Sequence, residues 1–151
     1  MNKQINTIIK TRSYLLDLTK DLSSAQLNTV PPAFQNNIIW NLAHLIAGQQ
    51  GICYMRAGLE PFVGQPFYAT YKPGTKPEKE LSEAEISEIK NLFITSIEQF
   101  GRDFENRIFE KYIPWKSRYG VELTNIEEAV DFINFHEGLH AGYIMAMKHL
   151  V

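Results

Sequence analysis

Two histidines four residues apart are the part of this chain best suited to chemistry. His136 and His140 lie in the stretch FHEGLHAG. Four residues advance an α-helix by about 400°, roughly one turn, so the two imidazoles share a face about 6 Å apart. Two imidazoles so placed can bind one transition metal. His44, in the stretch WNLAHL, could add a third ligand from a neighbouring helix and leave metal positions open for chemistry.

Another interpretation stays open for these residues, since buried histidines are often core residues satisfied by hydrogen bonds. His44 lies in a strongly apolar segment and gains functional weight only from the pair downstream. The small residues Gly138 and Gly142 beside the pair would leave space for a metal, water or ligand. His149 follows His140 by nine residues, about 900° of helical rotation, and therefore predicts a surface or capping residue on the opposite side.

The segment from His136 to His140 also matches the string H-E-x-x-H of zinc peptidases. In those enzymes the glutamate is the general base and a third ligand lies downstream. Here only His149 lies downstream, and it faces away, so the peptidase interpretation is weakly supported. Glu137 could still reach a metal-bound water as a catalytic residue; the alternative is a solvated helix face.

Pocket residues follow from the same helical geometry. Trp40 lies four residues before His44, and Tyr143 lies three after His140, so both are candidates to wall the site, with core packing as the alternative. Arg12 interrupts the apolar stripe of its helix. It either extends its head to the surface or directs a cation into the pocket, where it could bind a carboxylate.

Three further residues bear on the chemistry near the metal. The single thiol, Cys53, lies nine residues after His44 and is rotated about 180° from it, which predicts a packing residue. Any reacting thiol would then come from a cosubstrate. Trp115 and Tyr119, in the connection before the last helix, could form a lid.

Four helical segments must position these side chains, at about residues 3–20, 37–58, 82–107 and 124–149. The last two open with apparent capping boxes, SEAE from Ser82 and TNIE from Thr124. Prolines in residues 59–81 exclude regular helix there, and a chain of this length can run back along a helix. Residues 108–123 show a weak hairpin signal.

This order predicts one all-α domain over residues 1–151. The expected architecture is an up-down-down-up four-helix bundle with a long crossover between the second and third helices.

Composition narrows the classes of partner. The net charge of −2 and the lack of a basic stripe give no reason to expect nucleic acid. No apolar run approaches the roughly 18–20 residues of a membrane span, and no secretory signal is evident. One cysteine allows no internal disulfide, so we expect a cytoplasmic protein with no membrane partner.

At these positions the chain resembles the DinB superfamily of four-helix bundles. The resemblance rests on Asn37, Trp40 and His44 in one motif and on FHxxxHxGxI, from Phe135 to Ile144, in the other. It implies a divalent metal ion, zinc or nickel, held by His44, His136 and His140. It also implies a homodimer. Some members are S-transferases or isomerases that use a low-molecular-weight thiol.

Two classes of function therefore remain. The first is a metal-dependent enzyme, a transferase that activates a low-molecular-weight thiol cosubstrate or a hydrolase that uses metal-bound water. The second is a non-catalytic metal-binding protein, a dimer with a stress or interaction role. A metal site open to a pocket would favour the first class, and a sealed one the second.

Overall fold

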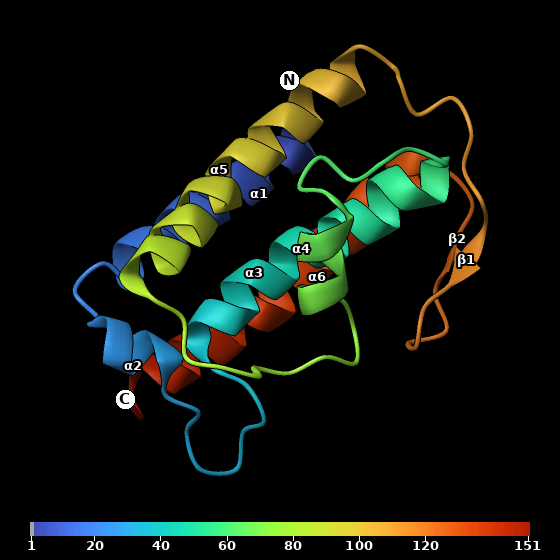
Figure 1. Ribbon diagram of the computed structural model, residues 1–151. Helices are drawn as coiled ribbons and strands as arrows, with labels where there is room; N and C mark the ends of the chain where they lie inside the picture. The colour runs from blue at the N-terminus through green and yellow to red at the C-terminus, as the bar shows by residue number, and fades with distance from the viewer. Residues whose placement is uncertain (1) are drawn as a thin grey trace.

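Four long helices make up the body of the protein (Figure 1). The computed structural model describes residues 2–151. The long helices are α1 (Lys3–Leu18), α3 (Ile38–Gln49), α5 (Glu83–Glu105) and α6 (Ile126–Lys148). The short elements are α2 (Ser24–Asn28), α4 (Gln65–Tyr71), β1 (Trp115–Lys116) and β2 (Glu122–Leu123). The chain is therefore mostly helical with two short strands, in agreement with the predicted all-α class.

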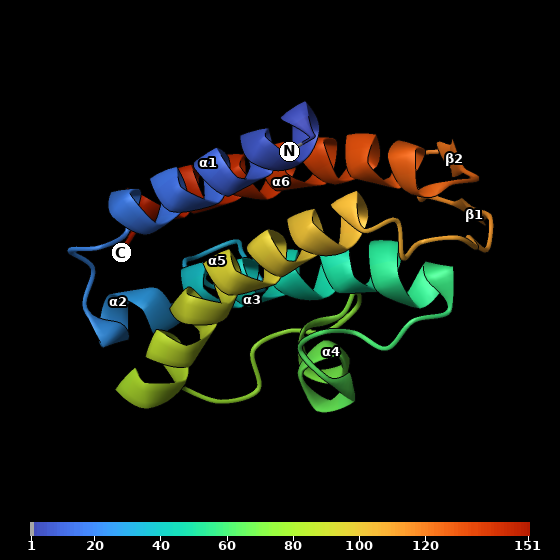
Figure 2. The same cartoon turned by 90° about the horizontal axis from the view of Figure 1, so that it is seen from above.

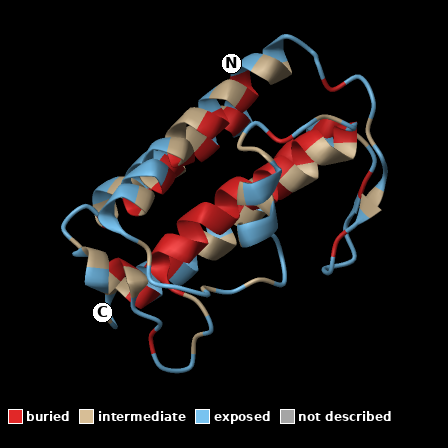
Figure 3. Ribbon diagram, viewed as in Figure 1, coloured by how far each residue is buried: buried red, intermediate tan, exposed pale blue. Residues whose placement is uncertain are grey.

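The long helices pack in two layers, with α1 and α6 in one and α3 and α5 in the other (Figure 2). Each contacts its layer partner and a helix of the other layer: α1 meets α6 and α5, and α3 meets α5 and α6. Helix α3 is the centre of this packing, because every residue from Ile38 to Gln49 is buried (Figure 3). The apolar sequence of this segment thus correctly predicted a buried helix.

Side-chain caps set the starts of the long helices. Ser82 forms the expected capping box with Glu85 at the start of α5. At α6 the expected cap is one residue out: Asn125, not Thr124, accepts a hydrogen bond from the backbone N–H of Glu128. The Glu128 carboxylate in turn accepts from the backbone N–H of Thr124 at 2.7 Å. The reciprocal bonding expected of a box is present, with different partners.

Helix α4 contradicts the expectation that residues 59–81 hold no regular helix. Pro66 stands in its first turn, where a backbone N–H has no helical partner and proline removes nothing. Gly64, with φ of +80°, turns the chain into the helix. The prolines therefore delimit a short helix within the connection.

The segment after α3 stays helical to Ala57, as expected, but with a change of helix type. Residues Gln50–Tyr54 form a π-helical turn and Met55–Ala57 a 3-10 turn, before Gly58 ends the run in the left-handed conformation. Gln50 is buried, and its side-chain oxygen accepts the backbone N–H of Phe62 at 2.6 Å. This bond ties the wider turn to the start of the long connection.

The hairpin between α5 and α6 is present as the two short strands. Strands β1 and β2 pair antiparallel, with Trp115 opposite Leu123. Among the described residues, no helix is long and apolar enough to cross a membrane.

Candidate metal centre

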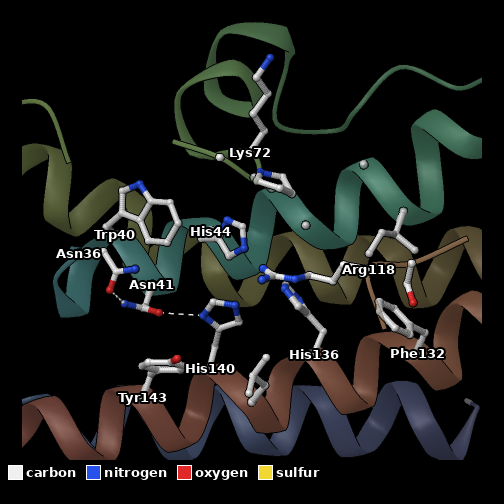
Figure 4. A pocket seen from close by; sticks show the side chains of 18 of the residues that line it. Asn36, Trp40, Asn41, His44, Lys72, Arg118, Phe132, His136, His140 and Tyr143 are labelled. Atoms are coloured by element: carbon white, nitrogen blue, oxygen red, sulfur yellow. Dashed lines mark hydrogen bonds between the residues drawn. The ribbon is translucent and has the colours of Figure 1, made fainter. Parts of the chain in front are cut away.

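The structure brings His44, His136 and His140 together between α3 and α6 (Figure 4). Each residue offers one ligand nitrogen, and these three atoms lie within 4.8 Å of one another. The ring centroids of His136 and His140 are 4.6 Å apart, and that of His44 is 4.8 Å from His140 and 5.4 Å from His136. Facing helices thus supply three convergent imidazoles.

His44 is held by the crossover connection and by its own helix. Its Nδ1 is 2.7 Å from the carbonyl oxygen of Tyr71, the last residue of α4. A carbonyl only accepts, so Nδ1 carries the proton and Nε2 keeps the lone pair. The Trp40 ring stacks on the imidazole at 4.6 Å with 10° between the planes. Both contacts fix the ring orientation.

His140 is oriented by Asn41, which lies on α3 about one turn before His44. Its Nδ1 lies 2.7 Å from Asn41 Oδ1. The amide of Asn41 is itself fixed, because its Nδ2 donates to the carbonyl of Asn37 and to the side-chain oxygen of Asn36, both at 2.8 Å. Asn41 therefore presents oxygen to His140, which again leaves Nε2 as the free ligand nitrogen.

His136 differs from the other two, because its buried Nδ1 has no hydrogen-bond partner among the described residues. Its ring packs directly on Gly48 of α3. A Cβ added at Gly48 would lie 2.8 Å from Cε1 of the His136 ring. Glycine at this position therefore lets the imidazole approach the helix backbone.

The electrostatics of the cluster suit metal binding. Burial lowers the pKa of His136 to about 3, with the neighbouring histidines adding to the effect. Burial and the nearby His44 lower the pKa of His140 to about 4, and burial lowers that of His44. All three imidazoles are neutral at pH 7, the form that binds metals.

The spacing of the donor atoms also fits a metal. Zn–N bonds of about 2.1 Å in a tetrahedral site place nitrogens about 3.4 Å apart. The donor atoms of the three histidines lie within 4.8 Å of one another, which is close to that spacing. His44 and His140 have their second nitrogen bonded to the protein, as metal-binding histidines do. The residues present fit a divalent ion.

A cavity of about 880 Å³ opens beside the three histidines. Its walls include the two predicted pocket residues, Trp40 and Tyr143. Trp115 and Tyr119, the lid candidates, line it from the β1–β2 hairpin. The volume falls in the range of small-molecule sites. That Trp40 and Tyr143 contact a ligand remains a prediction.

Arg12 and Glu137, the catalytic candidates, are not among the described residues that line this cavity. Arg12 is 0% exposed and Glu137 is 2% exposed. Arg12 donates to Glu137 Oε1 from Nε at 3.0 Å and from the second terminal nitrogen at 2.6 Å. It also donates to the carbonyl of Phe93 at 2.9 Å. The expected snorkelling arginine and solvated glutamate are thus wrong: the two form a buried ion pair.

The remaining sequence candidates have simple positions. Cys53 is fully buried, and burial raises the pKa of its thiol, in agreement with a packing residue. His149 is the exposed C-cap of α6, as predicted. A Cβ added at Gly138 or Gly142 would meet no neighbouring atom within 4 Å, so the expectation that these glycines make room at the site is wrong. Gly48 has that role.

Asn41 and Gly48 were not predicted from the sequence as site residues, although their spacing from His44 is a signal for it. They lie three residues before and four residues after His44, so all three share one helix face. A face that combines an amide, an imidazole and a glycine within a buried helix is unusual and could have been read as a site. The Tyr71 carbonyl carried no such signal.

The chain matches the profile of a known protein family. The family profile described as the DinB superfamily matches residues 7–144, which include all three histidines. No curated protein matches the chain.

Proposed function

The chain belongs to the DinB superfamily, a metal-binding family, and from this we propose that it is a metal-dependent enzyme whose ion is held by His44, His136 and His140. The observation that carries the proposal is the position of the cluster. The imidazoles stand in the wall of an open cavity rather than under a sealed core. A purely structural metal needs no such access.

The reaction that we propose is transfer of a low-molecular-weight thiol to a small electrophile: the sulfur forms a C–S bond, a carbon–halogen or epoxide C–O bond breaks, and the thiol proton is released to solvent. A divalent ion bound by three neutral imidazoles would stabilise the thiolate of an incoming thiol at neutral pH. The thiol comes from outside, because Cys53 is buried. Trp40 stacks on His44, and Trp115 and Tyr119 add aromatic walls to the cavity. A hydrolase using metal-bound water would need the same three ligands.

Zinc and nickel are the proposed ions, since neutral imidazole nitrogens suit both. We also propose a homodimer. The support for it is membership in the DinB superfamily, on which the sequence resemblance based the same expectation. The alternative function is a metal-binding dimer without activity.

The helix order and the location belong to the same proposal. The long connection between α3 and α5 supports the up-down-down-up order, as it is long enough to return along α3 (Figure 1). A single, buried cysteine supports a reducing, cytoplasmic location.

Metal content tests the proposal first. We expect about one zinc or nickel ion per chain purified without an affinity tag, measured by elemental mass spectrometry, and its loss in His136→Ala. His149→Ala is the matched control and should keep the metal, because His149 lies outside the cluster. Wild-type protein that takes up neither ion on addition would overturn the proposal.

A thiol-transfer assay then separates the enzyme from the non-catalytic protein. Loaded wild type should consume a small thiol in the presence of an electrophile such as a chloronitrobenzene or an epoxide. The three single histidine-to-alanine variants should not. Tight metal binding without turnover of any thiol would favour the interaction protein.

A further inference from the structure

The charges around the cavity are all of one sign. Arg56, Lys72 and Arg118 line it, and none of its lining residues in the described chain is aspartate or glutamate. These three cations come from the end of the α3 run, from the residue after α4 and from the β1–β2 hairpin. A cavity whose charged lining residues are all cations raises the local concentration of anions.

The three cations are also unpaired with acids. Among residues 2–151, the ion pairs are Arg12 with Glu137, Lys20 with Asp17 and Lys79 with Glu85. None of them involves Arg56, Lys72 or Arg118. Their charges are not neutralised by the protein and remain available to a ligand.

Aromatic rings orient the two arginines. The Arg56 guanidinium lies 5.6 Å from the centre of the Trp115 ring, and that of Arg118 lies 5.7 Å from the centre of the Tyr119 ring. A guanidinium held over a ring keeps its in-plane N–H groups free to donate to a carboxylate or phosphate. Flat walls beside them suit an unsaturated organic body.

Of the three cations, Arg118 is the one best placed to contact a ligand bound beside the histidines. In Figure 4 its side chain extends toward the three histidines, whereas the ammonium of Lys72 is turned outward at the rim. A guanidinium and a divalent ion at the histidines would be two positive groups in one cavity. A negative group between them would relieve their repulsion and be attracted by both.

We propose that the cavity binds small organic anions, carboxylates or phosphates on a flat unsaturated body, and that Arg118 is the residue that selects them. The proposal names the substrate class of the proposed enzyme and rests on that function only for the reacting group. The preference for anions belongs to the cavity itself and is measurable without metal.

Binding of benzoate, benzamide and phenyl phosphate, measured by calorimetry or NMR titration, tests the proposal. Benzamide has the shape of benzoate without its charge. Zinc-loaded and EDTA-treated wild type should both bind benzoate at least about tenfold more tightly than benzamide, as expected for a charge-assisted hydrogen bond. The ratio of benzoate to phenyl phosphate then tells which anion the cavity prefers.

Arg118→Gln should weaken benzoate binding about tenfold and leave benzamide binding unchanged, and Arg118→Lys should keep part of the preference. Lys116→Gln is the matched control: it removes the same charge from the same hairpin, but Lys116 does not line the cavity. Circular dichroism confirms that the variants are folded.

Equal affinity for benzoate and benzamide in EDTA-treated wild type would overturn the proposal. So would equal losses of benzoate binding in Arg118→Gln and Lys116→Gln, because the effect would then be one of net charge. If the protein does not bind metal, the proposed function is overturned but this proposal is not. The titrations of EDTA-treated protein measure anion binding to the cavity in the absence of metal.

Discussion

Asn41 Oδ1 accepts a hydrogen bond from Nδ1 of His140 across the gap between α3 and α6, at 2.7 Å. The bond sets the tautomer of His140 and directs Nε2 toward the cluster. Removing it leaves a ring that is free to turn and a nitrogen without a partner. Such outer contacts typically contribute 10- to 100-fold to metal affinity.

Asn41→Leu should therefore weaken metal binding by about 10- to 100-fold, measured by competition with a chromophoric chelator. Asn41→Asp keeps the acceptor and should retain tight binding. Asn134→Ala is the control, because the hydrogen bond that the Asn134 side chain makes within residues 2–151 goes to the Val130 carbonyl of its own helix. Unchanged affinity in Asn41→Leu would show that the bond does not orient the ligand.

Gly48→Ala should also weaken metal binding. The new Cβ would lie 2.8 Å from Cε1 of the His136 ring, so the imidazole must move away from α3. We expect a loss of at least about tenfold in affinity, by analogy with other changes in ligand orientation. The same chelator competition measures it.

Gly138→Ala is the matched control for that prediction. Gly138 lies on the exposed face of α6, with nothing within 4 Å of an added Cβ. Alanine should stabilise the helix by up to about 1 kcal/mol and leave metal affinity unchanged. Equal effects of both substitutions on metal binding would contradict the role of Gly48.

The Arg12–Glu137 pair predicts a loss of stability rather than of catalysis. Glu137→Leu leaves the fully buried guanidinium without its counter-ion, which typically costs about 3–5 kcal/mol. Urea unfolding should show this loss, and the double variant with Arg12→Met should recover most of it. If Glu137→Gln stays as stable as wild type but has no activity with full metal loading, the catalytic role that the sequence suggests for Glu137 would be correct.

Local sequence signals predicted the parts of the protein that depend on local geometry. The histidine pair and the helical apolar spacing depend on residues three or four apart, and the Ser82 box depends on a similar spacing. The metal cluster was predictable because His136 and His140, four residues apart, place two ligands on one helix face. A third ligand must then come from a facing helix, as His44 does. The missed helix α4 shows the limit of proline as a signal, since its effect depends on the position within a turn.

Other features depend on contacts between distant segments. The partner of Arg12 is 125 residues away, and no local pattern distinguishes a buried pair from a surface arginine. Gly48 matters only because α6 places His136 against it. The Tyr71 carbonyl reaches His44 through the backbone, where the residue type carries no information.

The depressed histidine pKa values make the metal-free protein sensitive to acid. An unfolded imidazole has a pKa near 6.5, whereas the pKa of His136 in the folded protein is about 3. Below pH 6.5 the unfolded chain therefore binds a proton that the folded chain does not. The contribution of neutral His136 to the free energy of unfolding is therefore fully present above pH 6.5 and is lost as the pH falls toward about 3.

EDTA-treated protein should thus unfold at a lower urea concentration at pH 5 than at pH 7. His136 alone should account for about 2 kcal/mol of the difference, from 1.36 kcal/mol per pKa unit over about 1.5 units. His136→Leu should reduce the pH dependence by that amount. If His136→Leu and wild type lose equal stability between pH 7 and pH 5, His136 is not held neutral by burial. Its side chain would then be open to water in the metal-free protein.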